Sequence, residues 1–293
     1  LLGGATHFFG YPITPASEIA HSAALLFTKT GRVFLQAEDE VNAINMVYGA
    51  AAAGARAMTG TSGPGLSLMA EGISYIAACE LPCVIVDVQR AGPGLGNIWP
   101  EQSDYNAVVK GGGHGNYKNI VLTPNSAQEM CDFTYIAFDI ADTYRMPVII
   151  LSDAFIGQMM EPVALPETVI KGKRKDWALY GDAETRNNLI TSILMNTQVL
   201  SNLNWHLQSK YETVEQELFF TEELLTDDAE LLFVAYGISS RVCVTAMQSL
   251  RKRGVKIGLL RLKTLFPFPK QRLLELSKKL DKIIVVELSN GQL

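Results

Sequence analysis

The chain has 293 residues, of which 48% are hydrophobic and 19% charged. This length and composition fit a globular protein of about two domains. A formal net charge of −5 gives no reason to expect nucleic acid as a partner. The most apolar stretch, residues 41–58, is interrupted by Asn42, Asn45 and Arg56 and is too polar to span a membrane. We therefore expect no membrane association and a cytoplasmic location.

The cysteines and the chain ends add two expectations. The four cysteines show neither a C-x-x-C spacing nor a zinc or iron–sulfur pattern, so we expect buried thiols in a reducing compartment and no metal site in this chain. The sequence starts at Leu1 and stops soon after a strand-like run, so we expect further residues at both ends, including the C-terminus. The cysteines are Cys79, Cys83, Cys131 and Cys243.

Strand-like apolar runs alternate with helical patterns through the first half of the chain, which predicts βαβ units and a parallel sheet. Runs such as CVIVDV and PVIIL are apolar throughout, as in strands covered on both faces. The predicted strands are Thr6–Phe9, Val33–Gln36, Ala55–Thr59, Cys83–Val88, Asn119–Leu122 and Val148–Leu151. The predicted helices are Ser17–Thr28, Glu40–Ala53, Leu66–Cys79 and Ser126–Tyr144.

The strand signal disappears after Glu161 and returns near Leu231. We therefore predict an α/β domain over residues 1–165, a linker over 166–228 with one or two helices, and a second, smaller α/β domain over 229–293. In the second domain we expect strands at Leu231–Ala235, Val255–Leu260 and Lys282–Glu287, and helices at Ser239–Arg253 and Lys270–Leu280.

Polar and glycine-rich segments follow the first four predicted strands. In an open α/β sheet, ligands bind at the carboxyl ends of the strands, so these segments are expected to meet at one edge. After the first strand come Pro12, Ile13 and Thr14; after the second, Glu40; after the third, Thr61, Ser62 and Gly63; and after the fourth, Arg90 with Gly92, Gly94 and Asn97.

These segments are also compatible with other functions. The glycine spacing fits neither G-x-G-x-x-G nor a P-loop, and Ser62 is not in a G-x-S-x-G elbow. Taken alone, Glu40 is equally a helix-capping acid, and Arg90 is equally a solvated surface charge. Following a buried strand, Arg90 is suited to hold a substrate carboxylate.

With these residues placed, the chain resembles the alpha subunit of 2-oxoacid:ferredoxin oxidoreductases along nearly its whole length. In the first domain the resemblance rests on GYPITP (10–15), the E-x-N-A-x-x-x-x-x-G spacing from residue 40, TSGPG (61–65) and QRAGPGLGN…PEQSD (89–104). In the second it rests on VAYGISSR (234–241), GLLRLKTLFPFP (258–269) and the terminal NGQL. The resemblance implies a thiamine-diphosphate pyrimidine-binding domain followed by a domain similar to the C-terminal domain of transketolase.

The resemblance also implies roles for the site residues. Glu40 would contact the N1′ nitrogen of the cofactor's aminopyrimidine, while Thr14 and Arg90 would hold the substrate's carboxylate and carbonyl. Pro12, Ile13, Thr61, Ser62 and Gly63 would line the cofactor pocket, and Gly92, Gly94 and Asn97 would belong to the substrate loop. The G-D-G motif of thiamine enzymes is absent. The most similar string, Gly181-Asp182-Ala183, lies in the polar linker and follows no predicted strand.

The missing motif implies that other subunits complete the enzyme. A beta subunit would hold the diphosphate and Mg²⁺, gamma and ferredoxin-like delta subunits would accompany it, and 4Fe–4S clusters would lie on the partners. Coenzyme A would be the co-substrate and ferredoxin the electron acceptor, as in anaerobic metabolism. The small-residue helix 40–54 is then an expected interface element.

The loop after Arg90 looks closer to the branched-chain (2-oxoisovalerate) members than to the 2-oxoglutarate members, which tend to carry Ser-Thr there. A second substrate carboxylate would be expected to pair with another cation, and this loop has no Lys or Arg between Arg90 and Lys110. The expected reaction is oxidative decarboxylation of 2-oxoisovalerate to acyl-CoA and CO₂. The same reaction on 2-oxoglutarate, giving succinyl-CoA, remains an alternative, as do a non-catalytic scaffold subunit and a binding module without chemistry.

Overall fold

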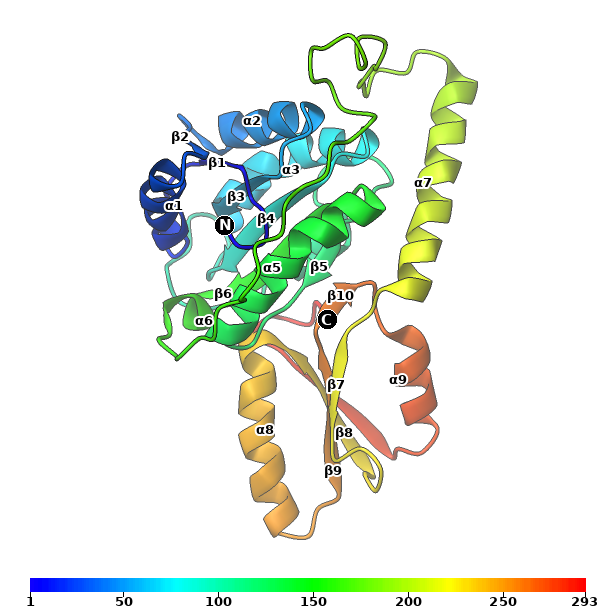
Figure 1. The fold of residues 1–293 in the computed structure, drawn as a ribbon. Helices are drawn as coiled ribbons and strands as arrows, with labels where there is room; N and C mark the ends of the chain where they lie inside the picture. The colour runs from blue at the N-terminus through cyan, green and yellow to red at the C-terminus, as the bar shows by residue number, and fades with distance from the viewer.

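The computed structural model describes residues 1–293 and contains two α/β units, the smaller below the larger in Figure 1. The larger unit contains β1 (His7–Gly10), α1 (Ser17–Lys29), β2 (Val33–Gln36), α2 (Glu40–Ala52), β3 (Ala57–Thr61), α3 (Gly63–Ala78), β4 (Cys83–Gln89), α4 (Tyr105–Val109), β5 (Ile120–Leu122), α5 (Ala127–Tyr144), β6 (Pro147–Asp153) and α6 (Ala154–Gln158). After it come α7 (Thr197–Glu217), β7 (Thr221–Leu224), β8 (Leu231–Tyr236), α8 (Gly237–Lys252), β9 (Ile257–Leu262), β10 (Thr264–Phe266), α9 (Lys270–Ser277) and β11 (Lys282–Val286).

The large sheet has the strand order β10-β5-β6-β4-β3-β1-β2. All of its neighbouring strands are parallel except β10 and β5, which are antiparallel. The chain runs from β1 outward to β2 and then returns to β3 on the other side of β1. This reversal makes β1 and β3 the topological switch point, where the connecting loops diverge and leave a crevice.

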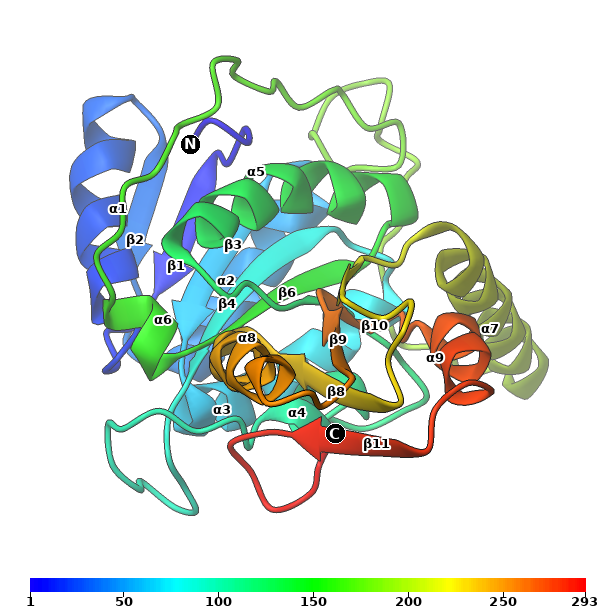
Figure 2. The ribbon, with the colours of Figure 1, turned by 90° about the horizontal axis from the view of Figure 1, so that it is seen from below.

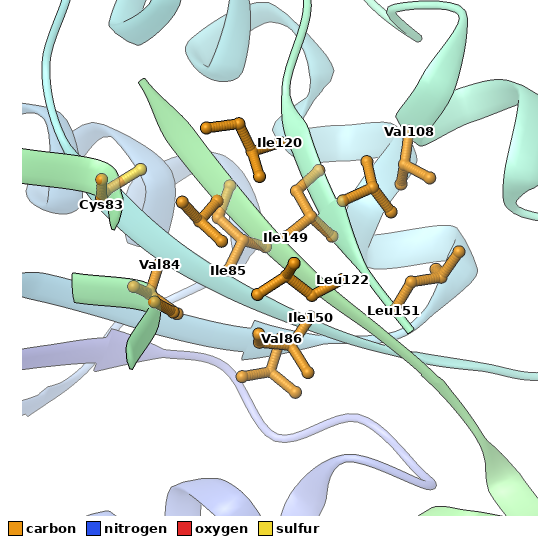
Figure 3. Packing of buried hydrophobic residues seen from close by; sticks show 14 of the residues in the cluster. Cys83, Val84, Ile85, Val86, Val108, Ile120, Leu122, Ile149, Ile150 and Leu151 are labelled. Carbon is orange, nitrogen blue, oxygen red and sulfur yellow. The ribbon is translucent and has the colours of Figure 1, made fainter. Parts of the chain in front are cut away.

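Helices cover both faces of this sheet. One face, including Phe8 and Met58, lies under α1 and α5, and the other lies under α2 and α3. The middle strands are buried on both faces, which explains their continuous apolar sequences. Figure 3 shows this core around β4, β5 and β6, with Ile85, Leu122 and Ile149 among the fully buried side chains.

The structure bears out the six predicted strands of the first half, with small shifts. Strand β3 begins at Ala57 and ends at Thr61, two residues later than predicted. Helix α3 begins at Gly63, three residues before the predicted start at Leu66. Proline is compatible with the first turn of a helix because its missing N–H has no partner there. The glycine-rich segment is thus the N-terminus of α3.

The segment without predicted strands contains one strand as well as a helix. Residues 159–196 cross the larger unit without regular secondary structure, α7 runs along its side, and β7 follows (Figure 1). Strand β7 has the sequence TEEL, is half-buried throughout, and pairs antiparallel with β9. An edge strand of this kind carries no apolar pattern, so the expectation of a strand-free segment was wrong here.

The second sheet has the order β11-β8-β9-β7, and α8 packs on β8 and β9. Immediately after β9 the chain leaves this sheet, and β10 pairs antiparallel with β5 of the larger sheet. Seen from below, β10 lies against the larger unit while β8, β9 and β11 project toward the viewer (Figure 2). A single hydrophobic core therefore continues from the larger sheet to Tyr236, Leu260 and Leu265. The domain boundaries stay a prediction.

None of the helices combines the length and apolarity that crossing a membrane requires.

All four cysteines are free thiols, but only Cys83 and Cys243 are buried. Cys79 and Cys131 are half-buried, which corrects the expectation that all four are interior. The Tyr48 hydroxyl lies 3.2 Å from Cys79 Sγ, where α2 packs on α3.

Candidate functional site

The parallel strands bring the predicted site residues to one edge of the sheet. The segments after β1, β2, β3 and β4 all lie at its carboxyl end, beside the switch point between β1 and β3. This convergence could be expected from the sequence because parallel strands separated by helices must share their direction. The order of the strands in the sheet was established by the structure.

Two adjacent acids at the start of α2 have different tasks. Asp39 is the N-cap residue, and its Oδ1 accepts a hydrogen bond of 2.7 Å from the backbone N–H of Asn42. Glu40, the first residue of the helix, has a side chain that no protein group hydrogen-bonds, and it is only 5% exposed. Because Asp39 satisfies the helix end, the Glu40 carboxyl is available to a ligand.

The Glu40 carboxyl lies against the first turn of α3. A Cβ atom built on Gly65 would stand 2.6 Å from Glu40 Oε1 and would also collide with Thr61 Oγ1. Thr61 and Ser62 are fully buried, and neither hydroxyl has a hydrogen-bond partner. Buried polar atoms are rarely left unpaired, so this cradle has the character of a binding site for a ligand with polar edges.

Arg90 connects the loops after β1 and β4. Its Nη1 donates to the carbonyl of Thr14 at 2.8 Å, and its Nη2 donates to the carbonyl of Leu95 at 2.9 Å. Its Nε–H is buried without a partner. The structure thus brings Arg90 and Thr14 together as expected, and the guanidinium retains unpaired N–H groups.

A polar cavity of about 370 Å³ lies beside Arg90. It is enclosed by the glycine-rich loop, the N-terminus of α3 and the C-terminal segment. Its lining includes Gly92 and Gly94, together with Gly63, Glu101, Ser103, Asp104 and Asn290. Asn97 does not line it; this residue is exposed near the loop tip, where its Oδ1 accepts from the Trp99 N–H. Pro12 and Ile13 are half-buried in the first loop.

Two acids were not among the predicted site residues: Asp104, which lines this cavity, and Asp87, which lies in β4. Asp87 is fully buried in β4, opposite Thr61 of β3, and apart from the neighbouring acid Asp104 neither of its oxygens has a hydrogen-bond partner. Asp104 lies against the start of α3, with Oδ2 3.3 Å from the position of a Cβ on Gly63. The N–H of Asp104 donates to Gln89 Oε1 at 3.1 Å, and Gln89 lies two residues after Asp87 on the same face of β4. The two acids are therefore neighbours, and each shifts the pKa of the other. In the sequence, the sign of a buried acid at this position was the single Asp inside the otherwise apolar run CVIVDV.

The environment of this pair favours one proton between the two acids. Burial, and then the charge of Asp104, raise the pKa of Asp87 well above its usual value. Burial raises the pKa of Asp104 to about 6, while the hydrogen bond from Asp87 and the charge of Arg90 oppose this rise. Two carboxylates sharing a buried site cannot both ionise without a large cost. Asp87 is thus the protonated partner and Asp104 the charged one near neutral pH.

Gln102 was also missed, and it joins the site to the second unit. Its side chain is fully buried; Nε2 donates to the carbonyl of Tyr236, and Oε1 accepts from the hydroxyl of Ser239 and the N–H of Leu288. The loop after β4 is therefore fastened to β8, α8 and the segment after β11.

Unlike the Glu40 carboxyl, the Asp182 carboxylate is fully engaged by neighbouring protein groups. Its carboxylate pairs with Arg174 and accepts hydrogen bonds from the N–H and hydroxyl of Thr185. Both partners, Arg174 and Thr185, lie within ten residues of Asp182 in the same connecting segment. Nothing at Asp182 therefore contradicts the expectation that this chain lacks the diphosphate motif.

A doubly wound parallel sheet with a buried, unengaged carboxyl at its switch point is the arrangement of a ligand-binding α/β protein. The family models name the class as thiamine-diphosphate-binding. The model of the family described as "Pyruvate flavodoxin/ferredoxin oxidoreductase, thiamine diP-bdg" matches residues 2–222, and that of "Pyruvate:ferredoxin oxidoreductase core domain II" matches residues 229–293. The chain belongs to this family and is an alpha subunit of a 2-oxoacid:ferredoxin oxidoreductase.

Curated relatives carry two substrate names. The chain is 57% identical over 294 residues to the ketoisovalerate oxidoreductase subunit VorB of Methanothermobacter marburgensis, a match covering 100% of this chain and 84% of the relative. It is 42% identical to the 2-oxoglutarate synthase subunit KorA of Archaeoglobus fulgidus, over 99% of this chain and 84% of the relative.

Solved structures agree on the fold. The 2-oxoglutarate:ferredoxin oxidoreductase from Magnetococcus marinus, solved with 2-oxoglutarate, coenzyme A and succinyl-CoA bound, is similar with a TM-score of 0.91 and 30% identity. The match covers 99% of this chain, which spans 56% of that larger chain. A split-gene transketolase matches with a TM-score of 0.57 and 14% identity, which shows a shared fold only.

Proposed function

We propose that this chain supplies half of the active site of an enzyme that oxidatively decarboxylates 2-oxoisovalerate to acyl-CoA and CO₂ and passes the electrons to ferredoxin. The observation that carries the proposal is the buried Glu40 carboxyl, which lies beside a glycine cradle and two unpaired hydroxyls and has no partner in the protein. Thiamine diphosphate, when bound, supplies a carbon nucleophile and an electron sink.

The residues of the cradle fit the pyrimidine half of that cofactor. Glu40 would hold a proton at the N1′ nitrogen, and the absence of a side chain at Gly65 would leave room for the ring. The hydroxyls of Thr61 and Ser62 offer hydrogen bonds to polar ring atoms. Pro12, Ile13 and Gly63 would frame the same pocket, and the diphosphate with its Mg²⁺ would lie on the partner.

Arg90 and Thr14 would bind the substrate. The unpaired Nε–H of Arg90 and the side chain of Thr14 lie at the sheet edge, where a 2-oxoacid can present its carboxylate and carbonyl. An arginine already held by two carbonyls keeps a fixed orientation, which lowers the entropic cost of binding. Gly92, Gly94 and Asn97 would shape the loop over the substrate.

The charge around Arg90 supports a substrate with one carboxylate. Glu101 and Asp104 line the cavity, and no second cation lines it. A second carboxylate would meet these acids, and like charges at close range in a partly buried site are repulsive. The higher identity to the ketoisovalerate relatives than to the 2-oxoglutarate relatives supports the same choice. The 2-oxoglutarate reaction is the second candidate, because a structure with that substrate is also similar.

An exposed apolar loop tip supports a shared active site. Leu95, Ile98 and Trp99 are 78%, 58% and 70% exposed, respectively. Clustered exposed apolar side chains often mark an interaction surface, and these lie on the loop that follows Arg90. The partner would be the diphosphate-binding beta subunit. Gamma and delta subunits with 4Fe–4S clusters, electron transfer to ferredoxin, coenzyme A as acyl acceptor, and a cytoplasmic location complete the proposal.

Glu40→Gln tests the proposal in the purified native complex. Reduction of ferredoxin or a viologen dye with coenzyme A is compared for 2-oxoisovalerate, 2-oxoglutarate and pyruvate. We expect a preference for 2-oxoisovalerate and a loss of at least about 100-fold in kcat in the variant, since it removes a positioned proton-holding group.

Glu38→Gln is the matched control, because Glu38 is exposed two residues away. It should retain the rate of the unaltered complex. A preference for 2-oxoglutarate would reject the substrate assignment but keep the chemistry. Full activity of Glu40→Gln would reject the catalytic role and favour a scaffold subunit.

A further inference from the structure

The Asp87–Asp104 pair is not part of the cofactor cradle, yet it borders it. Asp87 is opposite Thr61 in the sheet, and Asp104 lies against Gly63 at the N-terminus of α3. On its other side Asp104 lines the cavity that also contains Arg90. The pair therefore connects the floor of the proposed cofactor pocket to the proposed substrate cavity.

The charged groups around the pair come from three segments. Asp87 and Arg90 belong to β4 and its end, Glu101 and Asp104 to the loop before α4, and the N-terminus of α3 lies against Asp104 at Gly63. Arg90 is the one cation among them. Because the helix end also favours a negative charge, a single ionised carboxylate at Asp104 is stabilised, whereas a second one at Asp87 would have no compensating charge.

We propose that Asp87 and Asp104 are positioning residues that together place one negative charge beneath Arg90 and so set the affinity of the cavity for an anionic substrate. Asp87 donates its O–H to the carboxylate of Asp104 and keeps that carboxylate turned toward Arg90. The charge partly neutralises Arg90 when the cavity is empty. The bound 2-oxoacid competes with this charge, which favours release of anionic ligands. The inference rests on the proposed function.

The proposal predicts how substrate affinity changes with pH. Burial raises the pKa of Asp104 to about 6. Below that pH the pair becomes neutral, and the cavity keeps only Glu101 of the two acids that line it with Arg90. Above it, the Asp104 carboxylate repels the substrate carboxylate. The KM for 2-oxoisovalerate should therefore rise about tenfold from about pH 5 to pH 8, as expected for one charge at close range in a partly buried site, while kcat changes less.

Three variants of the native complex separate the charge from the fold. Asp104→Asn removes the charge and should give a low KM that is independent of pH. Asp87→Asn retains an N–H donor toward Asp104 and should keep the transition of the unaltered enzyme. Asp87→Leu removes the hydrogen bond that lowers the pKa of Asp104, so the transition in KM should move to higher pH. Asp227→Asn is the control, since Asp227 is exposed in a turn of the second unit.

Infrared difference spectroscopy gives a readout that does not require turnover. At neutral pH the protonated Asp87 should contribute a carboxylic acid C=O band, and Asp87→Asn should remove it. An active complex whose KM does not depend on pH, an Asp104→Asn variant with the unaltered pH profile, or the absence of this band would overturn this inference alone. A complex that oxidises no 2-oxoacid would overturn the proposed function and this inference with it.

Discussion

At the scale of single residues, the site depends on a division of tasks between neighbours. Asp39 caps α2, so the Glu40 side chain is not needed at the helix end and faces the cradle. A single acid could not cap the helix and bind a ligand at the same time. A carboxylate buried without a partner costs free energy. The chain tolerates this cost at Glu40, Thr61 and Ser62 together, which is the pattern expected where a ligand completes the hydrogen bonds.

Gly65→Ala and Gly49→Ala form a matched pair of predictions. Both glycines are helical, and alanine is ordinarily favoured in a helix by about 1 kcal/mol. At Gly49 nothing lies within 4 Å of the added methyl group, so a gain in stability of that order is expected. At Gly65 the methyl group meets Glu40 and Thr61, so a loss of about 1–3 kcal/mol is expected from overpacking.

Calorimetric melting of the assembled complex, with and without added thiamine diphosphate, measures both effects. The stabilisation of the complex by the cofactor should be reduced in Gly65→Ala and retained in Gly49→Ala. Equal behaviour of the two variants would show that the space beside Glu40 is not a ligand cradle.

At the scale of elements, the long connection from β4 to α4 is the segment that gives the site its shape. Its beginning is held by Arg90, which bonds to the carbonyls of Thr14 and Leu95. Its end is held by Gln102 and by Gln89, whose Oε1 accepts from the N–H of Asp104. The tip between them is exposed. The fixed ends hold the exposed tip at the sheet edge, where it can contact a ligand or a partner.

Gln102→Met should loosen this connection. Methionine has a similar length but leaves the Tyr236 carbonyl, the Ser239 hydroxyl and the Leu288 N–H without partners. Unpaired buried groups of this kind should cost about 3 kcal/mol in total. We expect a lower melting temperature of the complex and a higher KM for the 2-oxoacid. Gln208→Met, on the exposed face of α7, is the control. An unchanged KM in Gln102→Met would mean that the second unit does not stabilise the substrate loop.

At the scale of the whole molecule, the two units are joined by polar groups as well as by the shared core. Arg261 of β9 is 3% exposed, and it pairs with Glu129 of α5 and Glu222 of β7. Lys263 also reaches Glu129 Oε1, at 3.2 Å. Burial alone would raise the pKa of Glu129, but the hydrogen bonds and charge of Arg261 keep that pKa below its usual value.

The joint between the units should therefore be sensitive to acid. A carboxylate whose pKa is lowered by folding contributes stability above its unfolded pKa, and this contribution is lost as the pH falls through the folded value. Glu129→Gln should destabilise the complex by about 3 kcal/mol near neutral pH, because Arg261 loses a buried partner. The difference from the unaltered protein should shrink below about pH 4.

Melting temperatures measured over this pH range test the expectation, with the exposed Glu215→Gln on α7 as control. A difference that persists unchanged at low pH would show that the Glu129 carboxylate does not contribute through its charge.

The sequence by itself determined the alternation of strands and helices, the position of Glu40 at a helix start, and the glycine-rich segments after two of the strands. These features depend on local periodicity and turn chemistry, which are read from neighbouring residues. Because parallel strands must align, the same information predicts that Thr14, Glu40, Thr61 and Arg90 lie at one edge.

Only the tertiary structure decided which distant groups meet. The pairing of Asp87 with Asp104, the attachment of Gln102 to the second unit, and the return of β10 to β5 join residues from separate segments. Strand β7 has a polar sequence and Asp87 is a single acid in an apolar strand, and the partners that stabilise them are not identified by local patterns. The free energy of such contacts depends on burial and geometry in the folded chain, and these exist only once the sheet has formed.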